Sequence, residues 1–232
     1  MCGIAGIIQS NPSQFGKEQL KKMTDALAHR GPDGEGLWQD DSGHVLFGHR
    51  RLSIIDLSEA GKQPLIPNPS PRGGEGNIPR YTIIHNGEIY NYIELREELQ
   101  KKNYTFRSQT DTEVIVAAYD CWGDECLKHF DGMFAFAIWD STKKELFAAR
   151  DRFGEKPFFW HYDTNGFFFA SEMKALWAAG VERKPNLKLL FNFITIGYTD
   201  NPERTEETFF EDIHKLPPAS FLKFSLIYFN YT

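Results

Sequence analysis

The sequence predicts an α+β fold in which one sheet packs on another and helices cover the pair. Segments of strand type occur in both halves of the chain, and helical patterns lie between them without a regular strand-helix alternation. Hydrophobic residues make up 41% of the 232 residues and twenty residues are phenylalanine. This composition supplies a sizeable core and excludes general disorder.

The first 55 residues predict a strand, a helix and two further strands. Residues 1–8 are apolar, and glycines at positions 3 and 6 indicate a close approach of another backbone. Apolar residues at positions 20, 23 and 27 have helical spacing, and Gly31-Pro32 predicts the end of that helix. Residues 45–47 and 51–55 resemble strands on either side of Gly48-His49.

A proline- and glycine-rich stretch then interrupts regular structure. Residues 67–79 contain four prolines and three glycines among them, which predicts an exposed, mobile loop. Residues 81–85 follow as a strand, and the dipeptide Asn86-Gly87 predicts a turn at its end.

Two capping patterns predict the next two helices. Asn91 and Glu94 resemble a capping box before a helix with an apolar face at positions 92, 95 and 99. Thr110 and Glu113 form a fuller box, and the helix that they open is predicted to stop at Gly123.

The rest of the chain is mainly of strand type. Residues 133–139 alternate large and small apolar side chains, as a strand buried on both faces would. Further strands are predicted at residues 145–150, 157–162 and 166–170, followed by a short helix at 172–179 that Gly180 closes.

Charge and cysteine usage exclude several classes of protein. The net charge of −6 argues against a general nucleic-acid binder. Three cysteines without metal-ligand spacing indicate a cytoplasmic protein without disulfides or a metal site. No signal peptide is visible, and the longest clear apolar run, 133–139, is too short for a membrane span. We therefore expect no nucleic-acid or membrane partner.

Cys2 is the candidate nucleophile, because it follows the initiator methionine directly. Removal of Met1 would give one residue both a thiol and a free α-amine. The thiol pKa is ordinarily about 8.5 and that of an α-amine roughly 7.7–8.0, so the amine can accept the thiol proton near neutral pH. The alternative is an inert, small apolar side chain near a chain terminus.

Asn86 and Gly87 are the candidate oxyanion donors. A thiol that attacks a carbonyl needs hydrogen-bond donors where negative charge develops on oxygen. A side-chain amide at position 86 and a backbone N–H at position 87, where the missing Cβ permits close approach, could supply them. An ordinary turn without any catalytic role is the competing interpretation.

Charged residues near these positions could bind the two charges of an amino-acid substrate. A guanidinium of Arg50 or Arg51 suits the carboxylate, because its planar fork can bind both oxygens. Glu88 and Asp111 suit the ammonium group. Each has an alternative: a solvated strand edge for the arginines, a surface position for Glu88, and a favourable helix-dipole position for Asp111. Physical reasoning alone leaves the choice between Arg50 and Arg51 open.

Eight segments occur together and in order. They are Cys2-Gly-Ile-Ala-Gly, His29-Arg-Gly-Pro-Asp33, Gly48-His-Arg-Arg-Leu-Ser-Ile-Ile-Asp56, Asn86-Gly-Glu-Ile-Tyr-Asn91, Asp111-Thr-Glu-Val-Ile115, Gly132-Met-Phe-Ala-Phe-Ala-Ile-Trp-Asp140, Ala149-Arg-Asp-Arg-Phe-Gly154 and Ser171-Glu-Met-Lys-Ala-Leu176. This set closely resembles the N-terminal glutaminase domain of glutamine-hydrolysing asparagine synthetases of the bacterial B type. That domain is a class II glutamine amidotransferase and an N-terminal-nucleophile (Ntn) hydrolase.

The resemblance implies a four-layer αββα fold with two mainly antiparallel sheets. It implies that Cys2 attacks the carboxamide of L-glutamine, that the α-amine transfers the proton, and that a thioester is hydrolysed to glutamate after ammonia leaves. By motif, Arg51 matches the carboxylate clamp, Asn86 and Gly87 match the oxyanion donors, and the remaining substrate-binding positions match Leu52, Ile54, Glu88 and Asp111.

The resemblance extends over residues 2–222 as the glutaminase domain, with residues 223–232 as a truncated exit segment. The ATP-binding synthetase domain of the family, with its Ser-Gly-Gly-x-Asp-Ser loop, is absent from this sequence. We expect no cofactor for the glutaminase step, since ATP and Mg would belong to the synthetase domain. The expected partners are L-glutamine and a synthetase domain or a second copy. Two other hypotheses are an inert fragment or docking module, and an ammonia donor to another acceptor.

Overall fold

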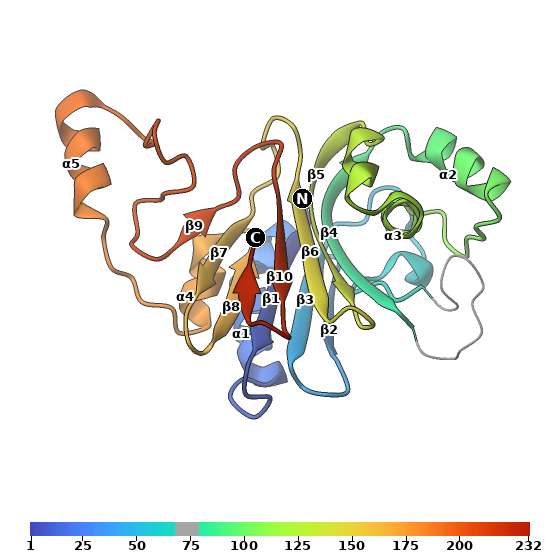
Figure 1. Ribbon diagram of the computed structural model, residues 1–232, viewed down its shortest axis with the longest axis horizontal. Helices are drawn as coiled ribbons and strands as arrows, with labels where there is room; N and C mark the ends of the chain where they lie inside the picture. The colour runs from blue at the N-terminus through green and yellow to red at the C-terminus, as the bar shows by residue number, and fades with distance from the viewer. Residues whose placement is uncertain (68–78) are drawn as a thin grey trace.

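The computed structural model describes residues 1–67 and 79–232, so the predicted 67–79 loop lies almost entirely outside the described residues. Two stacked sheets form the centre of the molecule, and helices cover both outer faces (Figure 1). The first sheet has the strand order β2 (Gly34–Gln39), β3 (Val45–Arg51), β1 (Gly3–Gln9), β8 (Gly166–Ala170), β7 (Phe159–Tyr162) and β9 (His214–Lys215). The second has the order β11 (Asn230–Tyr231), β10 (Phe221–Ser225), β6 (Glu145–Arg150), β5 (Gly132–Asp140) and β4 (Tyr81–Ile89).

Every pairing between these strands is antiparallel. Helices α1 (Lys17–Asp25) and α4 (Met173–Ala178) pack on the first sheet. Helices α2 (Tyr92–Lys101) and α3 (Asp111–Trp122) pack on the second sheet. A third apolar layer lies between the two sheets. The predicted four-layer αββα architecture is therefore confirmed, and both sheets are buried on two faces over much of their area.

Strand β1 is buried along its whole length, as the sequence predicts. Ile4 and Ile8 face the layer between the sheets, whereas Ala5 and Ile7 face α1 and α4. A Cβ at Gly6 would lie 2.2 Å from the ring of Phe169 on the neighbouring strand. Only glycine permits this packing, and it brings β8 close to the strand that follows the candidate nucleophile.

Strand β5 confirms the prediction of a strand between two layers. Phe134, Phe136 and Ile138 face α2 and α3, whereas Ala135 and Ala137 face the first sheet. The small side chains let the two sheets approach, and the large ones fill the space beneath the helices.

Strand β4 does not end in a turn at Asn86-Gly87, so that prediction is wrong. The strand continues to Ile89, and Asn86 and Gly87 lie opposite Ala135 and Phe134 of β5. A local turn preference is overridden here because β5 offers a full-length antiparallel partner.

Strand β3 ends at Arg51, so the predicted strand at 51–55 is also wrong. The chain turns away from the sheet there and wraps around the Arg51 side chain, which donates to the carbonyls of Ser58 (3.0 Å) and Asp56. The Oδ2 atom of Asp33 accepts a bond from the N–H of Ser53 at 2.8 Å and fixes the departing loop.

The capping predictions are correct only in part. The Oγ1 atom of Thr110 accepts from the N–H of Glu113 at 3.2 Å at the start of α3, and Gly123 (φ 60°) follows its last residue. The Glu113 carboxylate does not return to Thr110; it accepts from the N–H groups of Arg107 and Ser108 instead. Asn91 precedes α2 without a side-chain cap, because its amide bridges to the 129–131 backbone.

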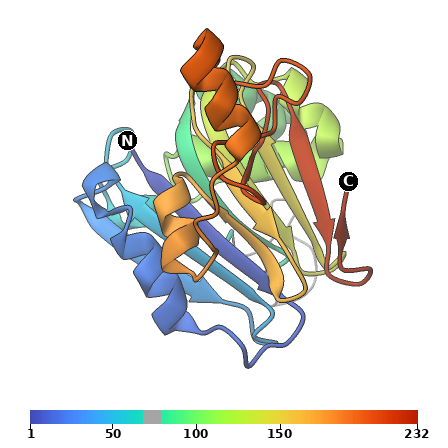
Figure 2. The same ribbon diagram turned by 90° about the vertical axis from the view of Figure 1, so that its left-hand side faces the viewer.

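Several elements were not predicted. They are β2, the short strands β9 to β11, and helix α5 (Leu187–Ile196), which stands away from both sheets in Figure 1 and lies in front of them in the turned view of Figure 2. Residues 223–232, predicted as an exit segment, complete β10 and form β11 at the edge of the second sheet. No helix of the described residues is long and apolar enough to span a membrane.

Candidate active site

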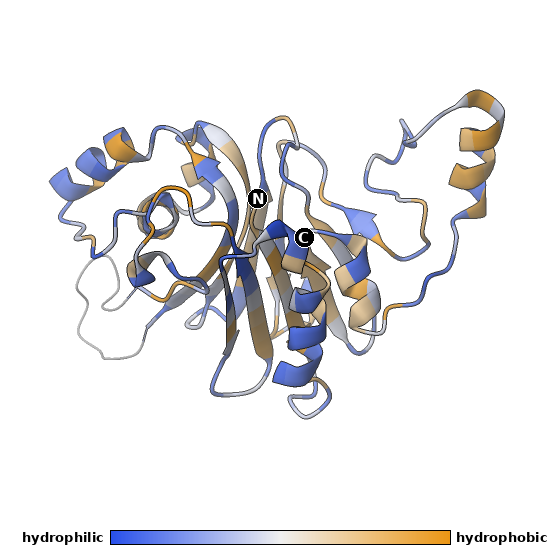
Figure 3. Ribbon diagram, turned by 180° about the vertical axis from the view of Figure 1, so that it is seen from behind, coloured by the Kyte–Doolittle hydropathy of each residue, from blue (hydrophilic) through white to orange (hydrophobic). Residues whose placement is uncertain are grey.

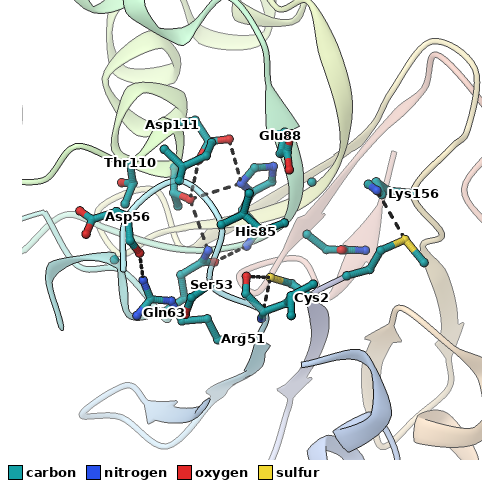
Figure 4. Close-up of a pocket in the computed structure, with 18 of the residues that line it drawn as sticks. Cys2, Arg51, Ser53, Asp56, Gln63, His85, Glu88, Thr110, Asp111 and Lys156 are labelled. Atoms are coloured by element: carbon teal, nitrogen blue, oxygen red, sulfur yellow. Dashed lines mark hydrogen bonds and ion pairs between the residues drawn. The ribbon is translucent and has the colours of Figure 1, made fainter. Parts of the chain in front are cut away.

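A cleft lies where the start of β1, the end of β3, the end of β4 and the first turn of α3 meet (Figure 4). Its volume is about 130 Å³. This is below the roughly 300–1,000 Å³ of sites for drug-sized ligands, so it suits one small molecule. All eight residues predicted for the site line the cleft: Cys2, Arg51, Leu52, Ile54, Asn86, Gly87, Glu88 and Asp111.

The Cys2 thiol lies on the backbone of Leu52. It accepts a hydrogen bond from the Leu52 N–H at 3.4 Å and contacts the Leu52 carbonyl oxygen at 3.6 Å. Burial raises the pKa of the Cys2 thiol, while the Leu52 N–H, the chain terminus and Arg51 act in the opposite direction. A protonated thiol is a weak nucleophile, so a base must remove its proton before attack.

The register of the second sheet fixes where the Gly87 N–H points. Phe134, opposite Gly87, exchanges hydrogen bonds with Asp151 on its other side: the Asp151 N–H donates to the Phe134 carbonyl (2.8 Å), and the Asp151 carboxylate accepts from the Phe134 N–H (3.2 Å). Gly87 and Phe134 are therefore a non-hydrogen-bonded pair. Because β4 is the last strand of its sheet, the Gly87 N–H points outward from the sheet edge.

The other N–H groups on this edge have partners. Ile83 donates to the Leu65 carbonyl (3.0 Å), His85 to Gln63 Oε1 (2.6 Å) and Ile89 to Asp111 Oδ2 (2.9 Å). Within the part of the chain that the structure describes, no acceptor is found for the Gly87 N–H. The edge of β4 thus presents one open donor, and it lines the cleft.

Position 87 requires glycine for two reasons. Its φ is +152°, a conformation that residues with a side chain rarely adopt, and a Cβ there would lie 2.1 Å from the Met133 carbonyl oxygen. The close approach that the structure shows at this glycine is to β5, whereas the expected approach to a ligand stays a prediction.

The Asn86 side chain is fully buried, and neither atom of its amide has a partner among the described residues. An unpaired buried amide costs roughly 1–3 kcal/mol of stability, so native proteins seldom retain one without a reason. Together with Gly87, the cleft therefore holds a side-chain donor and a backbone donor that no protein group uses, on the same wall of the site as the sheet edge.

The two arginines lie on opposite sides of β3. Arg51 lines the cleft, and its guanidinium has no carboxylate within ion-pair distance among residues 1–67 and 79–232. Arg50 lies outside the cleft; it donates to the Thr24 carbonyl (3.0 Å) and pairs with Asp25 of α1 and Glu35 of β2. Of the two arginines, Arg51 is therefore the one whose N–H groups are available to an anion bound in the cleft.

Glu88 and Asp111 occupy the opposite wall of the cleft. Glu88 is half-buried and its carboxylate has no ion pair among the described residues. Asp111 is buried at the first position of α3, where one oxygen accepts from the Ile89 N–H. Arg51 thus lies on one side of the cleft and Glu88 and Asp111 on another, and Asp56 and Lys156 also belong to its lining (Figure 4).

Leu52 and Ile54 belong to the loop that follows β3. The side chain of Ile54 is 58% exposed at the mouth of the cleft, whereas Leu52 is half-buried and contributes its backbone to the thiol. The backbone contact was not predicted, since no side-chain pattern records it.

Sequence reasoning missed several residues that line or support the cleft. His49 reaches across from the first sheet, and its Nε2 lies 3.1 Å from the His85 carbonyl oxygen of β4. The imidazole of His85 contacts Thr112 Oγ1 at 3.3 Å. Lys156 is buried and its Nζ lies 3.5 Å from Met1 Sδ. His49 lies within a quoted motif, but no local pattern shows that it joins two sheets.

No group of three or more His, Cys, Asp or Glu side chains in the described ranges is arranged to hold a metal ion. The residues present supply a thiol, two unused donors, the Arg51 guanidinium, the Lys156 ammonium group and the carboxylates of Asp56, Glu88 and Asp111 around a space for one small zwitterion.

The glutamine amidotransferase domain model matches residues 1–228. The chain belongs to this family. The Ntn-hydrolase fold and the position of Cys2 in the cleft lining agree with that assignment.

Curated relatives of this amidotransferase domain include asparagine synthetase [glutamine-hydrolyzing] 3 of Bacillus subtilis, which is 40% identical over 97% of this chain and 35% of the relative. A putative asparagine synthetase [glutamine-hydrolyzing] 2 of Methanocaldococcus jannaschii is 40% identical over 87% of this chain and 40% of the relative. The chain spans about a third of the length of the curated relatives.

Among solved structures, glutamine phosphoribosylpyrophosphate amidotransferase from B. subtilis superposes with a TM-score of 0.68 at 19% identity, over 97% of this chain and 47% of the other. At this identity the likeness establishes the fold. It agrees with the two antiparallel sheets and flanking helices described above.

Proposed function

We propose that this domain hydrolyses L-glutamine to glutamate and ammonia through a thioester on Cys2. The observation that supports this proposal most strongly is the set of unused donors beside the thiol: the buried Asn86 amide and the outward Gly87 N–H. A pair of donors without protein acceptors is what an oxyanion requires.

Binding uses the separation of charge across the cleft. The α-carboxylate of glutamine lies against the Arg51 guanidinium, whose two bonds to loop carbonyls hold it in place and leave other N–H groups free. The ammonium group lies toward Glu88 and Asp111. With both ends fixed, the side-chain carboxamide is directed toward Cys2, and the attack becomes effectively unimolecular.

Thioester formation begins when the free α-amine of Cys2 takes the thiol proton. The sulfur then bonds to the carboxamide carbon, and the carbonyl oxygen becomes an oxyanion that accepts from the Asn86 amide and the Gly87 N–H. The α-ammonium returns the proton to the nitrogen of the carboxamide. The C–N bond breaks and ammonia leaves.

Hydrolysis repeats the same sequence with water. The α-amine removes a proton from water, the oxygen attacks the thioester carbonyl, and the same donors stabilise the second oxyanion. The C–S bond breaks, the sulfur recovers a proton from the α-ammonium, and glutamate is released. One base therefore serves both half-reactions, so retention of Met1 on the chain would abolish both.

The ammonia acceptor is proposed to belong to a second domain that amidates aspartate to asparagine with ATP. The names of the B. subtilis and M. jannaschii relatives support this, as does their greater length. Helix α5 supports the presence of a docked partner, because Phe191 and Ile194 are 66% and 73% exposed. Figure 3 shows α5 as a mainly hydrophobic helix apart from the sheets. A cytoplasmic location remains the expectation from the sequence.

The test is glutamate release from glutamine without ATP, measured on protein whose Met1 removal has been verified by mass analysis. Wild type is expected to turn over and Cys2→Ala to be inactive. Cys121→Ala is a matched control, because Cys121 is also a half-buried free thiol but lies outside the cleft. Comparable turnover in Cys2→Ala would exclude the proposed nucleophile.

A second candidate function is a docking module without catalysis, which the exposed apolar face of α5 also favours. The two functions differ in their dependence on Met1. A domain that retains Met1 when purified from its native host, and that still binds a partner, would support the docking function over the glutaminase.

A further inference from the structure

Three of the sequence motifs quoted above, those at 29–33, 149–154 and 171–176, supply no residue to the cleft lining. Arg30 lies in the 29–33 motif and Glu172 in the 171–176 motif, and neither side chain lines the cleft. Both lie beside the start of β1, next to Cys2, which directly precedes that strand. The proposed mechanism assigns no role to either residue, but their contacts indicate one.

Arg30 holds the backbone of the nucleophile. Its Nε donates to the Cys2 carbonyl oxygen at 2.9 Å, and its side chain is only 8% exposed. The stem packs on β1, where a Cβ at Gly3 would lie 3.4 Å from Arg30 Cδ. The guanidinium is therefore held against the peptide group between Cys2 and Gly3.

Glu172 in turn holds Arg30. Its Oε1 accepts from Arg30 Nη1 at 2.9 Å and from His29 Nε2 at the same distance, and Lys174 Nζ lies 3.0 Å from Oε2. Although partial burial raises the pKa of Glu172, the hydrogen bonds from these three residues lower it to about 2. The carboxylate is ionised throughout the neutral range, so the guanidinium keeps its partner.

The residue before Glu172 anchors the next part of β1. Ser171 Oγ accepts from the Ile4 N–H at 3.0 Å, and the Ser171 N–H donates to the Ile4 carbonyl at 2.9 Å. The 171–172 segment thus fixes β1 directly at Ile4 and, through Arg30, at Cys2.

We propose that Glu172 and Arg30 are positioning residues that orient Cys2 by its carbonyl group, so that its amine and thiol both point into the cleft. The physical reason is the place of Cys2 at the start of the chain. A terminal residue frays unless it is held, and once Met1 is removed no preceding peptide group restrains it. The bond to the carbonyl leaves both reactive groups free.

This inference rests on the proposed glutaminase function, and a variant series separates the two. Glu172→Ala removes the acceptor for Arg30, Glu172→Gln retains an oxygen at the same place, and Arg30→Met retains the stem without the donors. Glu207→Ala is the matched control: Glu207 also pairs with an arginine, Arg204, at 3.0 Å, and its side chain is 15% exposed, but it lies far from the cleft lining.

Two measurements are made on each variant. The first is kcat and KM for glutamine. Glu172→Ala and Arg30→Met are expected to lower kcat by about 10- to 100-fold with KM nearly unchanged, as expected for a misplaced reactive group. Glu172→Gln is expected to recover most of the rate, and Glu207→Ala to retain it.

The second measurement is the rate of iodoacetamide labelling at each cysteine, located by peptide mass analysis, which needs no turnover. Release of Cys2 from Leu52 is expected to speed its labelling in Glu172→Ala and Arg30→Met, while buried Cys126 in the same samples is labelled as slowly as in wild type. Inactive wild type would refute the proposed function, and the labelling rates would still decide the inference. Unchanged Cys2 labelling, a parallel rise at Cys126, or a kcat loss no greater than that of Glu207→Ala would each overturn it.

Discussion

Replacing Asn86 by leucine tests separately what this side chain contributes to kcat and to the stability of the fold. Leucine has the branched shape of asparagine and no polar atoms, although its two methyl groups are larger than the amide oxygen and nitrogen. The Asn86 amide is fully buried on β4, with no partner for its nitrogen or its oxygen in the described part of the chain. The change therefore removes an unpaired buried amide and breaks no hydrogen bond within the protein.

The expected magnitudes have opposite signs. Removing an unsatisfied buried polar group stabilises the fold by roughly 1–3 kcal/mol, and packing the larger leucine side chain offsets part of this gain. Removing one oxyanion donor lowers kcat by about 10²–10³-fold, which corresponds to roughly 2.7–4 kcal/mol of transition-state stabilisation. The variant is thus expected to be more stable and much less active.

The assay pairs thermal unfolding with glutamate release, on chains without Met1. For a domain of this size each kcal/mol shifts Tm by about 2–4 °C. Asn91→Leu is the matched control, because both atoms of the Asn91 amide are bonded, to the His129 carbonyl (2.9 Å) and the Asp131 N–H (3.0 Å). That control is expected to lose stability and keep kcat.

Two results would refute the reasoning. An Asn86→Leu domain that loses as much stability as the Asn91→Leu control would mean that the Asn86 amide has a structural partner. A stabilised domain with unchanged kcat would mean that the oxyanion forms elsewhere.

The other predictions concern the clamp, the glycine and a buried histidine. Arg51→Ala is expected to raise KM for glutamine strongly, through loss of a charged pair that costs about 2–5 kcal/mol when truncated, whereas Arg50→Ala, outside the cleft, should leave KM unchanged; equal effects in steady-state kinetics would contradict the placement. Gly87→Ala is expected to lower both Tm and kcat, because its Cβ would lie 2.1 Å from the Met133 carbonyl oxygen; an unaffected Tm would show that the strand edge adapts. Burial lowers the pKa of His49 from 6.5 to about 3, against the hydrogen bond to the His85 carbonyl. Between about pH 3 and pH 6.5 the His49 imidazole therefore binds a proton in the unfolded chain but not in the folded chain. The free energy of unfolding therefore falls as the pH falls through this range. Near pH 5 the loss is about 2 kcal/mol relative to neutral pH, and His49→Asn should lack it in urea titrations; parallel pH profiles would refute the assignment.

The layers of the fold could be predicted because they depend on local pattern. The alternation of large and small apolar residues in β5 predicts a strand between two layers, and the structure has helices on one face of it and the first sheet on the other. The capping signal at Thr110 likewise gave the start of α3. Such signals involve residues close in sequence, and tertiary packing reinforces them.

The errors arose where distant segments decide the backbone. Asn86-Gly87 has the local chemistry of a turn, but pairing with β5 keeps it extended. Residues 52–55 have strand composition, yet the bonds from Arg51 to the carbonyls of Ser58 and Asp56 turn the chain away from the sheet.

The candidate site was predictable as a set of residue types and not as a geometry. The chemistry of a thiol, an amide, a guanidinium and two carboxylates can be read from the sequence, and the structure brings all of these groups to one cleft. The contacts that hold these groups in place could not be predicted from the sequence. The Leu52 N–H, the edge position of the Gly87 N–H and the Glu172–Arg30 pair depend on strand order and register, which no short motif encodes.

The central claim is that the sulfur at position 2 becomes covalently acylated during turnover. The most direct measurement is mass analysis of the N-terminal peptide after the domain is mixed with glutamine and quenched in acid. A glutamyl group on Cys2, in chains that lack Met1, is the expected result. Turnover without any adduct, or an adduct confined to Cys121 or Cys126, would contradict the account.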